Sequence, residues 1–468
     1  MSAQLNPKIF KAYDIRGIYP LDINEENIAT IIRAIYTFYR RQLKKQNLTV
    51  VLGRDMRISS PALAAVAGQT LMDMGAKVID AGLVSTPTFY FSVLAGKYDA
   101  GIQISASHNP KDYNGIKFVY RNGDKLVKVS QNAGMDEVKN SALLGQFAPA
   151  VAGGETQPRV NFLDQELETV LSEFDATAFK PLRVVADAAN AMGSLYIDAL
   201  FKKVPGELIR MNFALDGTFP SHQADPFQPK NVVDLQKKVT AEKADLGMEP
   251  DGDGDRIFFV DEKGKIIPPT VITALITREI LKTTPGAKIL VDVRYTKNVV
   301  NVIKKLGGQA IISKVGHALI TEQLNREGAV FAGESSGHYY FAKQGGTESS
   351  LRAIGFVLEV ISKEAKPISE IVAGLSSAVE SGEYNFELPE SPSVKEILAG
   401  IVKDYQSGQL STLDGITIEF PAWRFNIRTS NTEPLMRLNV EGDDEAVVKE
   451  KLLELKEKIL AYKATEKE

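Results

Sequence analysis

Short apolar runs alternate with longer amphipathic runs over about the first 370 residues, and this alternation most constrains the fold. A helical stripe over residues 25–46 is followed by an apolar run at 48–52, a helix from Ser60-Pro61 and another apolar run at 77–80. A strand–helix–strand order implies parallel strands, because the helix returns the chain to the edge where the first strand began. The pattern therefore predicts α/β units with helices covering mixed or mostly parallel sheets.

The chain is too long for a single domain of ordinary size, with 468 residues of which 44% are hydrophobic. A Gly/Ala/Pro-rich stretch at 145–158 is a candidate linker after the first unit, and the alternation stops near residue 378. We therefore expect three successive α/β units and a smaller C-terminal α+β domain. The expected domains are domain I at 1–153, domain II at 154–264, domain III at 265–377 and domain IV at 378–468.

Composition excludes several classes of protein. The formal net charge of −4 argues against a nucleic-acid or membrane-surface partner, which would require a basic excess. The absence of cysteine excludes disulfides and thiolate chemistry, so any metal must be held by oxygen ligands or by the four histidines. The first residues lack an apolar signal-type core, and no apolar run reaches membrane-spanning length. We expect a cytoplasmic protein.

Three strand-like runs each end in a polar loop, at residues 105–110, 251–256 and 333–338. In open α/β sheets, ligands bind beyond the carboxyl ends of the strands. Loops in these positions would be able to line one cleft.

The first loop, Ser105 to Pro110, places a serine beside a histidine. Asn109-Pro110 is a turn signal, so we expect Ser107 and His108 to lie exposed at the tip of a tight turn. A hydroxyl beside an imidazole, with lysines close behind, fits a nucleophile or a phosphate carrier. A plain polar turn is the alternative.

The second loop spaces Asp251, Asp253 and Asp255 two residues apart, with glycines between them. Three carboxylates on a flexible backbone can surround one hard cation, and the positions left open for water or phosphate suit Mg²⁺. A calcium-binding EF-hand is rejected, because Arg256 stands where that loop needs glycine and the flanks are strand-like. A solvent-exposed acidic turn remains the alternative. Arg256 could bind a phosphate that also touches the metal.

Further polar segments suit sugar or phosphate binding. Gly333 to His338 offers a carboxylate, hydroxyls and an imidazole, which match the donors and acceptors of sugar hydroxyls. Arg428 to Pro434 combines an arginine with hydroxyls and turn amides, as in a phosphate cradle. Tyr13 to Gly17 holds another arginine, and His317 begins a predicted helix. For each segment taken alone, an ordinary turn or cap is the alternative.

Taken together and in this order, the segments resemble the motifs of the α-D-phosphohexomutases, most closely the bacterial phosphomannomutase/phosphoglucomutase type. The resemblance spans nearly the whole chain and implies four domains around a central cleft. It implies a mutase that interconverts hexose 1-phosphate and hexose 6-phosphate, of glucose or mannose or both. The intermediates would be a phosphoserine and glucose 1,6-bisphosphate or mannose 1,6-bisphosphate. We expect phosphosugar ligands, no nucleic-acid or membrane partner, and a monomer, with a dimer as the alternative.

The resemblance also assigns roles to individual residues. Ser107 would carry the phosphoryl group and, with Asp251, Asp253 and Asp255, hold Mg²⁺. Arg16 and Arg256 would stabilise the transferring phosphate, and His108 and Lys117 are the candidates for proton transfer. Lysine would need a lowered pKa for that task. The substrate-binding residues would be Tyr13, Arg294, His317, Glu334, Ser336, His338, Arg428, Ser430, Asn431 and Thr432.

The sequence departs from the family pattern in places. Gly345 to Ser350 stands where an Asp-rich stretch is expected, with Glu348 as a possible substitute. Ser105 replaces a usual threonine, and Arg294 stands where lysine is frequent. The competing interpretations are a phosphoglucosamine mutase, a phosphatase, and a non-catalytic sugar-phosphate-binding protein on the same fold.

Overall fold

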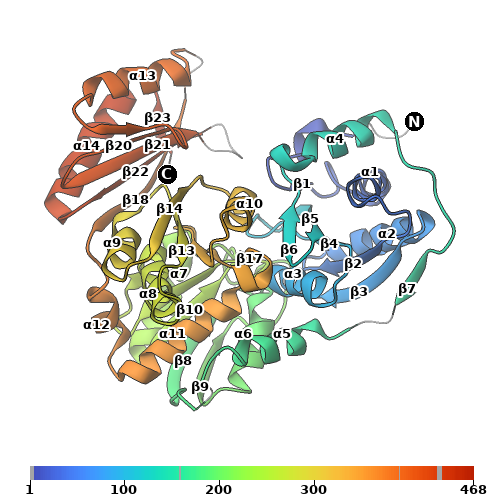
Figure 1. The fold of residues 1–468 in the computed structure, drawn as a ribbon, viewed down its shortest axis with the longest axis horizontal. Helices are drawn as coiled ribbons and strands as arrows, with labels where there is room; N and C mark the ends of the chain where they lie inside the picture. The colour runs from blue at the N-terminus through green and yellow to red at the C-terminus, as the bar shows by residue number, and fades with distance from the viewer. Residues whose placement is uncertain (1–4, 158–159, 176, 389–390, 430–434, 468) are drawn as a thin grey trace. The chain divides into compact units, whose positions relative to one another are not determined.

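The structure is a computed structural model that describes residues 5–157, 160–175, 177–388, 391–429 and 435–467 (Figure 1). The chain forms two compact units. The first unit comprises Met1–Ile267 and Ser336–Ile371, and the second comprises Pro268–Ser335 and Val372–Glu468. Among the described residues, no helix combines the length and the apolar character needed to cross a membrane.

The first sheet of the first unit has the strand order β1-β5-β4-β2-β3-β7, with β6 paired to β5. Its central strands β2, β3 and β4 are parallel, whereas β5 is antiparallel to both β4 and β1. The strands are β1 (Ile15–Ile18), β2 (Thr49–Arg54), β3 (Lys77–Leu83), β4 (Ala100–Ile104), β5 (Tyr113–Asn122), β6 (Lys125–Lys128) and β7 (Glu155–Gln157). The 3₁₀ helices are η1 (Pro7–Ile9) and η2 (Gln131–Ala133), and the α-helices are α1 (Glu25–Leu43), α2 (Ser60–Asp73), α3 (Thr86–Ala95) and α4 (Met135–Leu144).

Helices cover both faces of this sheet (Figure 1). Val50 of β2 packs in one cluster with residues of α1, α2 and α4, whereas the neighbouring Val51 packs in another with Phe89 and Val93 of α3. Successive side chains of a strand point to opposite faces, so a strand covered on both sides is apolar throughout. This is why the central strands appear in the sequence as continuous apolar runs.

The second sheet of the first unit has the order β12-β11-β10-β8-β9. Strand β10 is parallel to β8 and antiparallel to β11, so the chain reverses direction directly after β10. The strands are β8 (Leu182–Asp187), β9 (Gly206–Met211), β10 (Leu246–Pro250), β11 (Ile257–Asp261) and β12 (Ile266–Ile267), and the helices are α5 (Phe162–Leu171), α6 (Gly193–Phe201) and α7 (Pro229–Glu242). The same unit contains the antiparallel hairpin of β16 (Tyr339–Phe341) and β17 (Thr347–Glu348), with η3 (Ala342–Gln344) between them and α11 (Ser350–Glu364) after them.

In the second unit, β13 pairs in parallel with β14 and β15. These strands are β13 (Lys288–Asp292), β14 (Gln309–Ser313) and β15 (Phe331–Gly333), and they alternate with α8 (Pro269–Thr283), α9 (Lys297–Lys305) and α10 (His317–Glu327). Helix α12 (Ile368–Ala373) leads into an antiparallel sheet of order β19-β20-β21-β22-β18-β23. Its elements are β18 (Val379–Glu387), α13 (Val394–Asp404), β19 (Gln409–Ser411), β20 (Ile416–Glu419), β21 (Trp423–Thr429), β22 (Leu435–Gly442), α14 (Glu445–Ala461) and β23 (Thr465–Lys467).

This succession confirms the predicted fold class of three α/β units followed by a smaller α+β domain. The structure differs in detail at two polar strands. Part of the expected linker, Glu155–Gln157, forms β7 and pairs in parallel with β3. Strand β18 was not expected, because Val379–Glu387 carries few apolar residues and only Phe386 is buried within it. Its hydrogen bonds to β22 and β23 form this strand, and no local apolar pattern reveals it.

Candidate functional site

Ser107 lies in the loop that follows β4 and has a left-handed backbone, with φ of 51°. Only 2% of its surface is exposed, so the expectation of an exposed serine was wrong. The loop that follows β10 packs against it. Its Gly252 approaches so closely that a Cβ there would lie 2.3 Å from the Ser107 carbonyl oxygen. The Ser107 hydroxyl donates a hydrogen bond to Asp251 Oδ2 at 3.0 Å.

The acidic loop brings its three carboxylates together, as the spacing predicts. The chain reverses between β10 and β11, with Gly254 at φ of 77°. Asp251, Asp253 and Asp255 are all buried, and one ligand atom from each lies within 4.8 Å of the others. Asp253 Oδ1 is buried and has no hydrogen-bond partner within the described residues. Hard carboxylate oxygens with an unsatisfied position fit a divalent cation.

Lys117 lies beside these carboxylates, with Nζ 2.6 Å from Asp253 Oδ2 and 2.5 Å from Asp255 Oδ2. Burial lowers the pKa of Lys117, but the two carboxylates outweigh this effect and raise the pKa well above its usual value. Burial and the nearby Asp255 and Asp253 raise the pKa of Asp251 to about 8. Lys117 therefore remains protonated. Its single positive charge does not neutralise all of the carboxylates, so negative charge remains to bind a further cation.

Two arginines and a histidine lie near the Ser107 loop and the acidic loop. Arg16 donates a hydrogen bond from Nη1 to Asn109 Oδ1 at 2.5 Å and another from Nε to Asp14 Oδ2 at 2.7 Å. Arg256 Nε lies 3.8 Å from Asp251 Oδ2. His108 Nδ1 is 3.2 Å from Ser107 Oγ. Burial, and then the charges of Arg256 and Arg16, hold the pKa of His108 well below its usual value, so the imidazole is neutral near pH 7.

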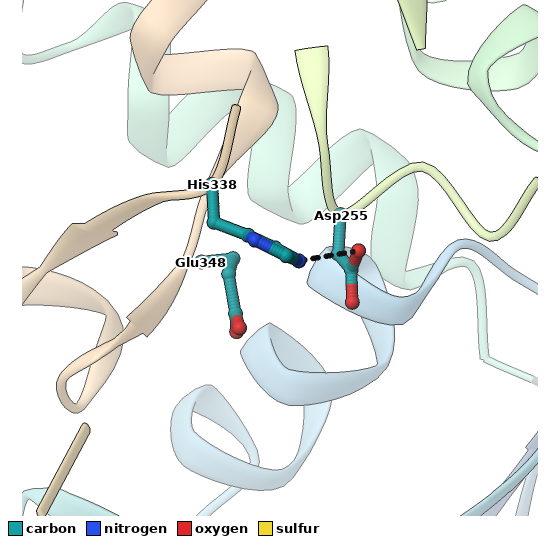
Figure 2. A group of neighbouring side chains, drawn as sticks. All are labelled: Asp255, His338 and Glu348. Atoms are coloured by element: carbon teal, nitrogen blue, oxygen red, sulfur yellow. Dashed lines mark ion pairs between the residues drawn. The ribbon is translucent and has the colours of Figure 1, made fainter. Parts of the chain in front are cut away.

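The hairpin of β16 and β17 adds His338 and Glu348 to the first unit, and Figure 2 shows the His338 ring pointing toward Asp255. His338 Nε2 is 3.2 Å from Asp255 Oδ1, and its Nδ1 is 2.9 Å from Ser336 Oγ. Asp255, His338 and Glu348 could by geometry hold a metal ion. However, Lys128 Nζ lies 2.5 Å from both oxygens of Glu348 and already balances that charge. The Asp251, Asp253 and Asp255 group is the stronger metal candidate.

The segment that departs from the family pattern, Gly345 to Ser350, has a structural place. Glu348 forms the buried ion pair with Lys128 of β6, 220 residues away in the chain. Ser349 caps α11 by accepting a hydrogen bond from the Arg352 backbone. The sequence gives no local signal for the Lys128 pairing.

In the second unit, three arginines surround Glu383 of β18. Arg428 and Arg437 lie 3.2 Å and 3.4 Å from its carboxylate oxygens, and Arg294 lies 3.6 Å away. Arg294 also pairs with Asp292 and with Glu334. A cluster of arginines in a buried setting can bind phosphate through several charged hydrogen bonds. Arg437 was not among the predicted site residues, because only the register of β21 and β22 places it opposite Arg428.

The remaining predicted substrate-binding residues fall in different places. Tyr13 is half-buried just before β1, and His317 is half-buried at the first turn of α10. Glu334 Oε1 accepts a hydrogen bond from the backbone of Gly316, next to His317. The 333–338 loop is divided between units, with Glu334 in the second and Ser336 in the first. Three predicted phosphate ligands, Ser430, Asn431 and Thr432, lie outside the described residues.

Models of one protein family match most of the chain. They are described as phosphoglucomutase/phosphomannomutase alpha/beta/alpha domains I, II and III and C-terminal domain, and match residues 7–142, 161–264, 268–378 and 383–458. These matches confirm the family expected from the motifs.

Similar proteins agree with this result over nearly the full length. A protein of Xanthomonas campestris named "Phosphohexose mutases" is 36% identical over 446 residues, which cover 94% of this chain and 96% of that protein. A "Phosphomannomutase" of Methanocaldococcus jannaschii is 34% identical over 462 residues and 98% of both chains. The crystal structure of a phosphoglucomutase/phosphomannomutase family protein from Burkholderia thailandensis superposes with a TM-score of 0.88, at 30% identity and 98% coverage of both chains.

Proposed function

This chain belongs to the phosphoglucomutase/phosphomannomutase family of intramolecular phosphotransferases, and we propose that it interconverts hexose 1-phosphate and hexose 6-phosphate through a phosphoserine at Ser107. The substrates would be glucose phosphate, mannose phosphate or both. The observation that carries the proposal is the Ser107 hydroxyl, 3.0 Å from Asp251 at the edge of a buried three-carboxylate cluster. A plain turn needs neither the strained serine nor the buried acids.

In the first half-reaction, a sugar hydroxyl oxygen bonds to phosphorus while the bond between phosphorus and Ser107 Oγ breaks, and the proton of that hydroxyl passes to Oγ. The product is a hexose 1,6-bisphosphate. In the second half-reaction, the other phosphorus bonds to Ser107 Oγ while its bond to the sugar oxygen breaks, and the Oγ proton passes to that sugar oxygen. His108 would carry that proton, and its neutral Nδ1, 3.2 Å from Oγ, supports this role. Lys117 carries its own proton and serves instead as a fixed positive charge on the carboxylates.

Asp251, Asp253 and Asp255, with an oxygen of the Ser107 phosphate, would hold Mg²⁺. When bound, the ion neutralises charge on the phosphoryl group during transfer. The unpartnered Asp253 Oδ1 and the oxygen-only donor set support this assignment. Arg16 and Arg256 would add charge stabilisation at the same phosphate.

The phosphate that does not react would be held by the arginine cluster of the second unit. Arg428 was expected there from the family resemblance, which implies for Arg294 only a place lining the sugar and phosphate site. We add Arg294 and Arg437 because they contact the same carboxylate as Arg428. Ser430, Asn431 and Thr432 would complete this site. By the family resemblance, Glu334 and Ser336 would bind sugar hydroxyls, and Tyr13, His317 and His338 would also contact the substrate. The bisphosphate would reorient before the second transfer, so that each phosphate occupies each position in turn.

The test is phosphorus NMR of the protein with Mg²⁺, a trace of glucose 1,6-bisphosphate, and glucose 1-phosphate or mannose 1-phosphate. We expect conversion to the 6-phosphates, loss of conversion in Ser107→Ala and after metal removal with EDTA, and a phosphoserine signal in the wild type. Ser92→Ala is the matched control, because Ser92 is equally buried but bonds only within α3. Release of inorganic phosphate would indicate a phosphatase, and preferential conversion of glucosamine 1-phosphate a different mutase. Binding without conversion would contradict the proposal.

A further inference from the structure

Arg57 lies between β2 and α2, fully buried, and its guanidinium binds the backbone of the Ser107 loop. It donates four hydrogen bonds, all to carbonyl oxygens of that loop and its exit. The acceptors are Ser107 at 2.7 Å and Asn109 at 2.6 Å from Nη2, and Pro110 at 2.7 Å and Tyr113 at 2.9 Å from Nη1. A buried arginine usually pairs with carboxylates, whereas most of the N–H donors of Arg57 bind backbone carbonyls of one turn.

The guanidinium is itself held in place from the other side. Asp55 Oδ2 lies 3.2 Å from Arg57 Nε, and Asp55 Oδ1 accepts hydrogen bonds from the Arg57 backbone and from Ser60 Oγ. The guanidinium carbon lies 5.3 Å from the centre of the Phe219 ring. The donor fork is therefore fixed before any substrate arrives.

The loop needs such support, because Ser107 adopts a left-handed backbone that non-glycine residues rarely occupy. Such a conformation persists only when surrounding contacts fix it. Four hydrogen bonds from one rigid, planar group set the orientation of the Ser107–His108 peptide and of the Asn109 and Pro110 carbonyls that follow it. They thereby set the direction of the Ser107 side chain toward Asp251.

We propose that Arg57 is a positioning residue of the phosphoryl transfer, which holds the Ser107 loop in its left-handed conformation so that Oγ stays aligned with Asp251 and His108. Arg57 contacts Ser107 only through its backbone carbonyl oxygen, and it therefore acts through the loop backbone. The proposal rests on the phosphoserine function of Ser107. Lysine cannot replace arginine here, because one ammonium with three donors cannot reach four carbonyls that converge on two nitrogens of a planar fork.

The test compares Arg57→Lys with Arg352→Lys. Arg352 is equally buried in the same unit, but it bonds Glu173, Gln344 and Ser349 and no residue of the Ser107 loop. We expect Arg57→Lys to lower kcat on the order of tenfold or more with KM within about twofold, since a displaced nucleophile loses alignment and not substrate binding. Arg352→Lys should keep kcat within about twofold of wild type, even if its Tm falls as much as the Tm of Arg57→Lys.

Two further measurements separate positioning from simple destabilisation. The phosphorus resonance of phospho-Ser107 should shift or broaden in Arg57→Lys and stay unchanged in Arg352→Lys. Guanidinium ion at millimolar concentration should raise kcat of Arg57→Ala and leave Arg352→Ala unaffected. If Arg57 variants do not fold, Asp55→Asn frees the same fork and should lower kcat to a smaller degree at constant KM.

Wild-type kcat in Arg57→Lys, or a loss of kcat that matches Arg352→Lys at equal Tm, would overturn the proposal. Failure of the underlying function would look different. The wild type would then show no phosphoserine resonance, and Ser107→Ala would remain active whatever residue stands at position 57.

Discussion

Glu348→Gln removes the carboxylate that pairs with Lys128, whose ammonium is buried between Tyr90 and Tyr340 at 4.7 Å and 5.5 Å from their ring centres. Both members of the ion pair are almost fully buried, and Nζ contacts both carboxylate oxygens. Removing one partner leaves an uncompensated buried charge, which costs about 3–5 kcal/mol. The aromatic faces offset only part of that cost.

The expected change in Tm follows from the size of the first unit. Its roughly 300 residues unfold with an entropy of about 0.6 kcal/mol per degree, so the loss corresponds to about 5–8 °C. Thermal unfolding followed by circular dichroism measures it. Lys128→Met should lower the free energy of unfolding by a similar amount, because it leaves the buried Glu348 carboxylate without its positive partner.

The double variant Lys128→Met/Glu348→Gln should recover at least about half of the loss, since no unpaired charge remains buried. Asp234→Asn is the control. It breaks an ion pair with Lys237 in which the two side chains are 72% and 73% exposed, and should change Tm by less than about 1 °C. A Glu348→Gln protein within about 1 °C of wild type, or a double variant that loses the sum of both single losses, would refute the reasoning.

Two further outcomes are expected. His222 forms a hydrogen bond with Asp187. Burial lowers the pKa of His222, but this hydrogen bond outweighs it and raises the pKa to about 9. Between about pH 6.5 and pH 9 the folded protein therefore binds a proton that the unfolded chain lacks. The free energy of unfolding measured in urea should fall as pH rises through this window, and it should fall less steeply in His222→Gln. An equal slope in the variant would argue against the pairing. Arg428→Lys should raise KM for hexose 1-phosphate about tenfold with little change in kcat, because a point charge replaces the fork that would grip the non-reacting phosphate; a loss confined to kcat in steady-state assays would place Arg428 at the reacting phosphate instead.

Much of the fold could be predicted, because strands buried on both faces and helices with one apolar face leave strong local patterns. The polar strand β18 left no such pattern, since its place depends on hydrogen bonds to β22 and β23. The site shows the same division. The glycine spacing of Asp251, Asp253 and Asp255 predicted their convergence, but nothing local indicated that Ser107 is covered by the loop around Gly252.

The sequence alone determined which chemical groups are available and in what order, because a hydroxyl beside an imidazole, oxygen ligands at metal spacing and arginines beside turn amides are properties of short segments. Only the tertiary structure decided the electrostatic state of those groups. Lys117 meets Asp253 and Asp255 from 136 and 138 residues away, and against the effect of burial these carboxylates raise the pKa of Lys117 well above its usual value. Arg57 likewise reaches the Ser107 carbonyl across 50 residues. Charge and burial act through space, so contacts between distant segments set the charge and orientation of the groups that the motifs supply.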